Sequence, residues 1–274
     1  MTLKTLNLVG SGRVGQTLAR LWHGHGSFVV QDVLTTSEAS AQAACAVIGA
    51  GTPVAQLQAM RAADVWMVAT PDAVIAGVAR TLAAAGLAPA TVFHCSGALG
   101  SVELASLAAQ GWQTASAHCI LSFAAVDAAV QQFPGTACAL EGNADACEWL
   151  RAAFSDIGAQ CFAVASEHKL LYHAAAVFAT NFLPVLQSVA EAAWQSSGVP
   201  DALIPGLRAT LLQNAVANIT RLGPAAALTG PAARGDTAAI ARQALAVQAW
   251  DPQAGAAYEA LSALGLRLAA QRGV

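Results

Sequence analysis

Charged residues are scarce in this sequence of 274 residues, since Asp, Glu, Lys and Arg together make up 11% of it. The formal net charge is −3 and no run of Lys or Arg occurs, which argues against a nucleic-acid partner. The N-terminus lacks a basic segment followed by an apolar run and a cleavage site, so no secretory signal is recognisable. We therefore expect a cytoplasmic protein that does not bind nucleic acid.

Paired cysteines are also lacking, because the six cysteines are scattered and no CxxC pair occurs. Their spacing fits neither a zinc site nor a disulfide framework, and no metal site is predicted. We expect reduced, mostly buried thiols, as is usual in the cytoplasm.

Apolar residues, by contrast, make up 56% of the chain. The stretch Leu170–Ala190 has no formal charge and is long enough to cross a bilayer. It also contains His173, Asn181 and Pro184, and polar groups are costly in lipid. We therefore expect no membrane span but a helix buried on most sides, with a kink at Pro184 just after Asn181.

The first part of the chain alternates short apolar runs with stretches of helical spacing. The expected strands are Lys4–Val9, Phe28–Leu34, Asp64–Ala69, Thr91–His94, Thr114–His118, Thr136–Leu140 and Gln160–Ala163. From Glu167 onward we expect only helices, over Glu167–Ser196, Ala202–Leu222, Thr237–Val247 and Pro252–Gln271. The pattern predicts an α/β Rossmann domain with a doubly wound, mostly parallel sheet over residues 1–165, and an all-helical domain over residues 166–274.

A GxGxxG motif closes the first expected strand and opens a helix. In such a turn Gly10 allows the tight bend, Gly12 lets a pyrophosphate approach the backbone, and Gly15 lets the helix pack on the strand. The helix N-terminus adds free N–H groups and a partial positive charge. The alternative is a glycine-rich turn without a ligand, but the strand–helix context favours a dinucleotide, held by Gly10, Ser11, Gly12, Arg13, Val14 and Gly15.

The end of the second strand bears on the choice of cofactor. NAD-binding domains usually carry an acid there, which holds the ribose hydroxyls. Asp32 has the right separation from the motif, but the strand continues past it and ends in Thr35, Thr36 and Ser37. These small hydroxyls tolerate a 2′-phosphate, so we lean towards NADP and leave NAD open.

Two further turns follow central strands, whose carboxyl ends line the ligand crevice of such folds. Ala69, Thr70 and Pro71 are expected to face the cofactor, and Asp72 to cap the next helix. After the following strand come Ser96 and Gly97, which either hold a carbonyl or carboxylate oxygen or only make a turn. His118 ends a later strand, and a hydrogen-bonded loop histidine is the more common explanation for it.

Lys169 and His173 lie four residues apart on one helical face, with Asn181 two turns further along. Polar side chains on an apolar helix need partners, and in a reductase such a lysine can donate a proton as hydride arrives. The alternatives are a solvated lysine beside Glu167 and a core histidine.

Arg234 lies in a loop that enters a helix, where Asp236 is a good N-cap. The arginine could bind a carboxylate, a cofactor phosphate or an acid of another subunit.

Together these motifs resemble the proteins that pair a Rossmann-like domain with the C-terminal domain of unknown function 2520. The matching stretches are the GxGxxG turn, Val68–Asp72, His94–Ala98, Lys169–Ala175 with Asn181, and Leu228–Pro231 through Arg234–Asp236. The chain is also similar, more distantly, to pyrroline-5-carboxylate reductase, ketopantoate reductase and the β-hydroxyacid dehydrogenases.

The resemblance implies an NAD(P)-dependent oxidoreductase that transfers hydride to or from a small carbonyl, imine or hydroxy acid bound between the two domains. It further implies a homodimer formed through a helical domain like the C-terminal domain of 6-phosphogluconate dehydrogenase. The alternative is a non-catalytic, dinucleotide-binding sensor of the same fold.

The resemblance also suggests roles for individual residues, with three departures. The implied catalytic residues are Ser96, Lys169 and His173, and the implied substrate-binding residues are Gly97, His118, Asn181 and Arg234. The β-hydroxyacid dehydrogenases have an asparagine one turn after the lysine, where this chain has His173. An arginine usual at the end of the second strand is Thr36 here, and a proline usual after the later histidine is Cys119.

Overall fold

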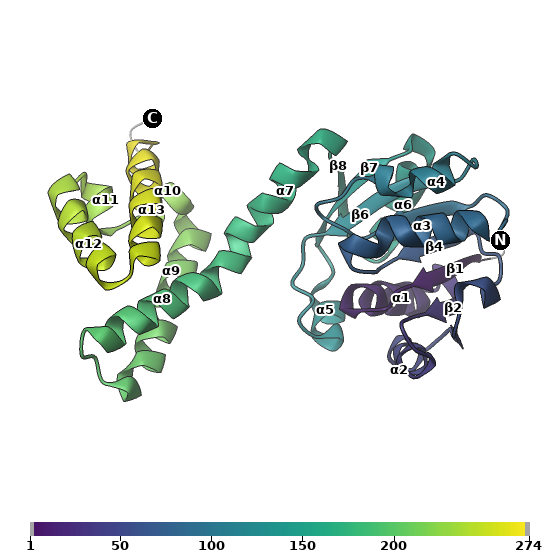
Figure 1. Ribbon diagram of the computed structural model, residues 1–274, viewed down its shortest axis with the longest axis horizontal. Helices are drawn as coiled ribbons and strands as arrows, with labels where there is room; N and C mark the ends of the chain where they lie inside the picture. The colour runs from purple at the N-terminus through teal and green to yellow at the C-terminus, as the bar shows by residue number, and fades with distance from the viewer. Residues whose placement is uncertain (1–2, 272–274) are drawn as a thin grey trace. The chain divides into compact units, whose positions relative to one another are not determined.

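The computed structural model describes residues 3–271, and the first part of these forms an eight-stranded sheet flanked by helices (Figure 1). The strands are β1 (Lys4–Val9), β2 (Phe28–Leu34), β3 (Thr52–Val54), β4 (Val65–Val68), β5 (Thr91–His94), β6 (Gln113–Cys119), β7 (Ala137–Gly142) and β8 (Gln160–Ala163). Their order is β3-β2-β1-β4-β5-β6-β7-β8, and all pairs are parallel except β6–β7. The expected mostly parallel sheet is confirmed, with β3 as an addition.

Helices pack on both faces of this sheet and bury two separate apolar clusters. They are α1 (Arg13–His25), α2 (Glu38–Ile48), α3 (Ile75–Ala84), α4 (Ala105–Ala108), α5 (Val126–Gln132) and α6 (Ala144–Asp156). One cluster contains Trp22 of α1 and Phe154 of α6, whose rings meet edge to face at 5.0 Å. The other contains Ile75 of α3 and Leu107 of α4. A core on each face is what a doubly wound sheet requires.

The register of the central strands brings three loops to one edge of the sheet. Val9, Val68 and His94 are aligned across β1, β4 and β5, which run parallel. The loops that follow are tied together as well, because the Ala69 N–H donates to the Val9 carbonyl at 2.9 Å. The carboxyl ends of parallel strands are where such folds bind ligands.

Beyond β8 the described chain is helical, as expected. It comprises α7 (Lys169–Ala176), a π-helical segment (Val177–Asn181), α8 (Phe182–Ser196), α9 (Ile204–Leu222), α10 (Pro224–Ala227), α11 (Gly230–Arg234), α12 (Thr237–Trp250) and α13 (Pro252–Ala270). The π-helical segment precedes Pro184, whose ring and missing N–H disrupt the regular hydrogen-bond ladder. Asp236 caps α12 as predicted, since its carboxylate accepts the Ala239 N–H at 2.9 Å.

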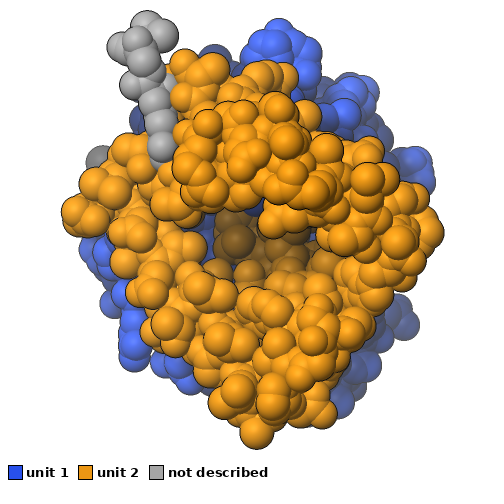
Figure 2. Space-filling view, turned by 90° about the vertical axis from the view of Figure 1, so that its left-hand side faces the viewer, with its two compact units in different colours: residues 1–178 blue, residues 179–274 orange. Residues whose placement is uncertain are grey.

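The chain divides into two compact units, the first ending at Phe178 and the second beginning at Ala179. The first unit thus extends past β8, the last strand, and includes α7. The second unit is orange in Figure 2, where the face in view is hollowed at its centre.

The expectation that the stretch Leu170–Ala190 is buried on most sides is wrong for the single chain. Leu171 is 75% exposed and Val185 is 56% exposed. The helix Ser166–Ser196 is long and apolar enough to span a membrane by length and composition alone. The apolar pattern predicts a helix, which the structure confirms, but the single chain leaves these side chains exposed.

All six cysteines are free thiols, as expected, although only Cys119 and Cys138 are buried and the other four are partly exposed.

Candidate functional site

Two adjoining pockets lie at the carboxyl edge of the central strands. The larger, of about 580 Å³, is called the glycine-loop pocket, and the smaller, of about 330 Å³, the histidine pocket. Both are lined by Ala69 and Thr70, so the two cavities meet at the loop after β4. Of the expected cofactor residues, the glycine-loop pocket is lined by Gly10, Ser11, Thr35, Thr36, Ala69, Thr70 and Pro71, and Val14 lines the histidine pocket.

The three glycines of the motif have three different surroundings. Gly10 has a φ of +80°, and a Cβ there would lie 2.6 Å from Thr70 Cγ2, so only glycine fits. A Cβ on Gly12 would meet nothing within 4 Å, which leaves space for a ligand against the backbone. A Cβ on Gly15 would lie 3.0 Å from Ala69 Cβ, because α1 packs closely on the sheet. These surroundings match the roles expected of the motif.

Unused hydrogen-bonding groups of the described residues gather at the same turn. Ser11 Oγ and Thr70 Oγ1 are buried without a protein partner. Gly12 is the N-cap of α1 and makes no side-chain capping bond, so N–H groups at this helix N-terminus remain available. Such groups suit a pyrophosphate, and the residues present therefore fit a dinucleotide.

Where the loop after β2 lines the glycine-loop pocket, it contributes hydroxyl groups and no charged side chain. Thr35 and Thr36 line it, while Ser37 caps α2 by accepting the Ser40 N–H at 3.2 Å. Asp32 lies inside β2, 1% exposed, in an ion pair of 2.5 Å with Arg61. Its carboxylate is therefore unavailable to a ribose. None of the described residues that line this pocket is charged, and Arg13 is exposed and outside the lining.

The histidine pocket is built around Gly97. A Cβ there would lie 2.5 Å from His173 Nδ1 and 2.8 Å from His118 Nε2, so the absent side chain makes room for both rings. His118 Nδ1 is bonded to the Tyr172 hydroxyl at 2.8 Å. His173 Nδ1 is buried and has no partner among the described residues. Two ring nitrogens thus face one small space.

Ser96 and Asp72 shape the loop beside this space. The Ser96 hydroxyl donates to Asp72 Oδ2 at 2.9 Å and accepts the N–H groups of Ala98 and Leu99. The prediction that Asp72 caps the next helix is wrong, because no side-chain capping bond forms there. The serine hydroxyl draws the carboxylate into the pocket wall instead.

Lys169 lies behind the histidine pocket and is not among its lining residues. It is 2% exposed, and its Nζ donates to the Ser96 carbonyl at 3.2 Å and to Ser116 Oγ at 2.5 Å. Ser116 in turn donates to the carboxylate of Glu141 at 3.0 Å. Burial lowers the pKa of Lys169, although the carboxylates of Glu141 and Asp72 act in the opposite direction.

Burial also determines the state of His118. Burial lowers the pKa of His118 to about 4, and the nearby His173 and Lys169 add to this effect. The Asp72 carboxylate acts in the opposite direction and raises this pKa. The imidazole is therefore neutral at pH 7. Tyr172 was missed in the sequence, although it lies three residues after Lys169 and so on the same side of the helix.

Asn181 and Arg234 belong to the second unit. Asn181 Oδ1 accepts the Thr180 hydroxyl at 2.8 Å, and Arg234 ends α11. Neither lines the two pockets, and their part in substrate binding stays a prediction.

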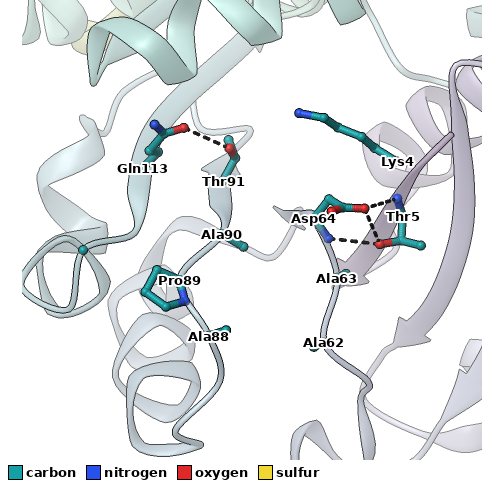
Figure 3. A pocket seen from close by; sticks show the side chains of 11 residues that line it. Lys4, Thr5, Ala62, Ala63, Asp64, Ala88, Pro89, Ala90, Thr91 and Gln113 are labelled. Carbon is teal, nitrogen blue, oxygen red and sulfur yellow. Dashed lines mark hydrogen bonds between the residues drawn. The ribbon is translucent and has the colours of Figure 1, made fainter. Parts of the chain in front are cut away.

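A third pocket, of about 510 Å³, lies at the amino ends of the same strands (Figure 3). Four of its polar side chains are hydrogen-bonded in two pairs. The Asp64 carboxylate accepts the N–H and hydroxyl of Thr5, and Thr91 donates to Gln113. Unlike the histidine pocket, this pocket has no buried side-chain nitrogen or oxygen without a partner among the described residues that line it.

Family models match most of the chain. The Rossmann-like domain matches residues 3–119 and the Domain of unknown function (DUF2520) matches residues 136–264. The chain combines these two domains. The resemblance predicted from the motifs is thereby confirmed, and no curated protein matches the sequence significantly.

Several solved structures share the fold of this Rossmann–DUF2520 chain. Protein TM1727 from Thermotoga maritima is 24% identical with a TM-score of 0.79, covering 98% of this chain and 100% of its own. A reductive aminase from Aspergillus terreus, in complex with NADPH and ethyl-5-oxohexanoate, is 17% identical with a TM-score of 0.64, covering 98% and 95%. A pyrroline-5-carboxylate reductase from Coxiella burnetii is 14% identical with a TM-score of 0.59, covering 97% and 99%.

Proposed function

We propose that this protein is an NAD(P)-dependent oxidoreductase acting on a small carbonyl, imine or hydroxy acid. The observation that carries the proposal is the junction of the two pockets at Ala69 and Thr70. A dinucleotide whose pyrophosphate rests on the backbone at Gly12 would extend along this junction, with its nicotinamide end towards the histidine pocket. The reductases that share the fold support the same reading.

The chain's own residues have three tasks in this proposal, while the nicotinamide supplies or accepts the hydride. The α1 N-terminus and Ser11 bind the pyrophosphate. Gly97 leaves room for the reacting group beside His118 and His173. The pocket walls exclude water from that group.

We also propose that NADP is the preferred cofactor. Asp32 is held by Arg61, so the glycine-loop pocket has no acid that would repel a 2′-phosphate. The hydroxyls of Thr35 and Thr36 can donate to phosphate oxygens instead.

We propose further that the working form is a cytoplasmic homodimer held by the helical unit. The exposed apolar residues there include Val185, Leu186, Val189, Leu211, Val216 and Ile219. Soluble chains rarely leave so many such groups uncovered on neighbouring helices. A second copy is the occupant favoured by the sequence, because the apolar stretch also carries polar groups that a lipid would not satisfy.

Calorimetric titration of the purified protein with NADPH and with NADH tests the function. Tight binding of one of them, followed by oxidation or reduction of the nicotinamide with a panel of small ketones, cyclic imines and hydroxy acids, is the expected result. Binding of neither would refute the proposal. Binding without any turnover would favour the non-catalytic sensor. The observation that favours this second candidate is that Lys169 is buried and does not line the histidine pocket.

A further inference from the structure

We propose that the reacting oxygen or nitrogen of the substrate meets His118, oriented by Tyr172, and that Lys169 is a positioning residue. The inference rests on the proposed function and departs from the role that the resemblance suggests for the lysine. Among the described residues, ring nitrogens of His118 and His173 face the histidine pocket without a protein partner, whereas the Lys169 ammonium group has two.

His118 is held at one ring nitrogen and free at the other. The Tyr172 hydroxyl occupies Nδ1 at 2.8 Å, and the two rings meet edge to face with centroids 5.6 Å apart. The Tyr172 ring also meets the Phe162 ring edge to face, with centroids 6.1 Å apart. These contacts fix the plane of the imidazole, so Nε2 is the atom left to face the pocket beside Gly97.

His173 adds a second free nitrogen at the same place. Its Nδ1 has no partner among the described residues and, like His118 Nε2, lies against Gly97. A substrate heteroatom between the rings can therefore exchange one hydrogen bond with each. A buried nitrogen without a hydrogen-bond partner is destabilising, so a ligand that pairs with it gains affinity.

Lys169 cannot make the same contact without losing its own. Its two partners, the Ser96 carbonyl and Ser116 Oγ, lie behind the pocket wall. Moving the ammonium group into the pocket would leave both oxygens poorly satisfied. The lysine acts instead through Ser96, whose carbonyl it holds next to Gly97.

A hydroxyl substrate loses one proton from oxygen and one hydride from carbon when it is oxidised. Neutral His118 donates its Nδ1–H to the Tyr172 oxygen and offers the Nε2 lone pair to the hydroxyl proton. As the O–H bond breaks, the C–H electron pair would leave as the hydride that a bound nicotinamide accepts, and C–O would become C=O. Reduction runs the same step backwards, with the Nε2 proton passing to oxygen.

The groups that face His118 are Tyr172 and His173 on α7, Asp72 after β4, and the buried Lys169. With its proton lost at neutral pH, His118 is ready to act as a base. The rate constant kcat/KM for oxidation should then be flat from about pH 6 to about pH 9. If Lys169 were the base, the same constant would rise with pH until the ammonium group has lost its proton.

The test compares His118→Asn, Lys169→Met and a control, His168→Asn. His168 is exposed and lines neither pocket. His118→Asn should lower kcat/KM about 10²- to 10⁴-fold, and the control should leave it unchanged. Lys169→Met should lower kcat/KM but keep the flat profile. A profile that rises with pH in the wild type and flattens in Lys169→Met would overturn the proposal.

A second readout needs no substrate, namely NMR of the histidine ring nitrogens. The His118 signals, assigned by their absence in His118→Asn, should show a neutral ring protonated at Nδ1 down to about pH 5. Tyr172→Phe should change that proton's position, and Lys169→Met should raise the titration midpoint. A ring that is charged at pH 7, or unaffected by Tyr172→Phe, contradicts the proposal. If the NMR result is as expected but the protein does not bind NADPH, the proposed function is refuted instead.

Discussion

Replacing Gly12 by alanine separates cofactor binding from folding. The added Cβ meets no protein atom within 4 Å, and Gly12 has a φ of −73° that alanine readily adopts. The free energy of unfolding should therefore change by less than about 1 kcal/mol. In the proposed placement, the Cβ would occupy the space through which the pyrophosphate approaches the backbone.

The loss of affinity can be worked from the bonds that this Cβ would prevent. A hydrogen bond to a charged group is worth about 1.5–3 kcal/mol, and one or two N–H groups would be kept from the phosphate. We expect a loss of about 2–4 kcal/mol, which is about 30- to 700-fold in the Kd for NADPH. Calorimetry measures the Kd, and urea denaturation measures the free energy of unfolding.

Two other glycines give the matched comparisons. Gly206 lies in α9 with nothing within 4 Å of an added Cβ, so Gly206→Ala should stabilise by about 0.5–1 kcal/mol and leave the Kd unchanged. Gly10→Ala forces a φ of +80° and a 2.6 Å contact with Thr70, and should impair both stability and binding. A wild-type Kd for NADPH in Gly12→Ala would refute the placement of the pyrophosphate.

Three further predictions concern the cofactor, the core and the surface. Thr36→Asp puts an acid at the end of β2, and should weaken NADPH relative to NADH about tenfold or more in calorimetry; an unchanged ratio would remove Thr36 from the cofactor site. Burial alone would raise the pKa of Glu141, but hydrogen bonds from Ser166, Ser101 and Ser116 outweigh it and hold that pKa below its usual value. The carboxylate thus stabilises the fold above its unfolded pKa and stops doing so as the pH falls below about 4, so wild-type stability in urea should drop there more steeply than that of Glu141→Gln. Val185→Glu should split the homodimer in sedimentation, whereas Val47→Glu, on an exposed face of α2, should not; a wild-type monomer, or vesicle binding by the apolar helix, would contradict the dimer.

Local chemistry explains why much of the fold was predictable. Strands such as Phe28–Leu34 and Thr91–His94 are short apolar runs between turn residues, and the structure has them with the expected bounds. The glycine motif was equally predictable, because the turn that it forms depends on residues next to one another in the chain. Even the burial of Asp32 inside its strand followed from the apolar residues on either side of it.

The site was only partly predictable, because its contacts join residues far apart in the chain. Lys169 reaches Ser96, 73 residues away, and Tyr172 reaches His118 across 54 residues. Asp72 was expected to bond within its own helix, but Ser96 competes for the carboxylate. No local pattern contains these partners, so neither the direction of Lys169 away from the pocket nor the role of Tyr172 was foreseen.

By itself, the sequence determined the order of strands and helices, the glycine turn and the apolar character of the long helix, because each of these arises from residues close together in the chain. Only the tertiary structure decided which side chains meet at Gly97, that the lysine lies behind them, and that the apolar helix stays exposed in the single chain. The physical reason is that burial and hydrogen bonding depend on the groups that the fold brings within a few ångströms of a side chain. The periodicity of apolar residues along the chain does not specify those groups.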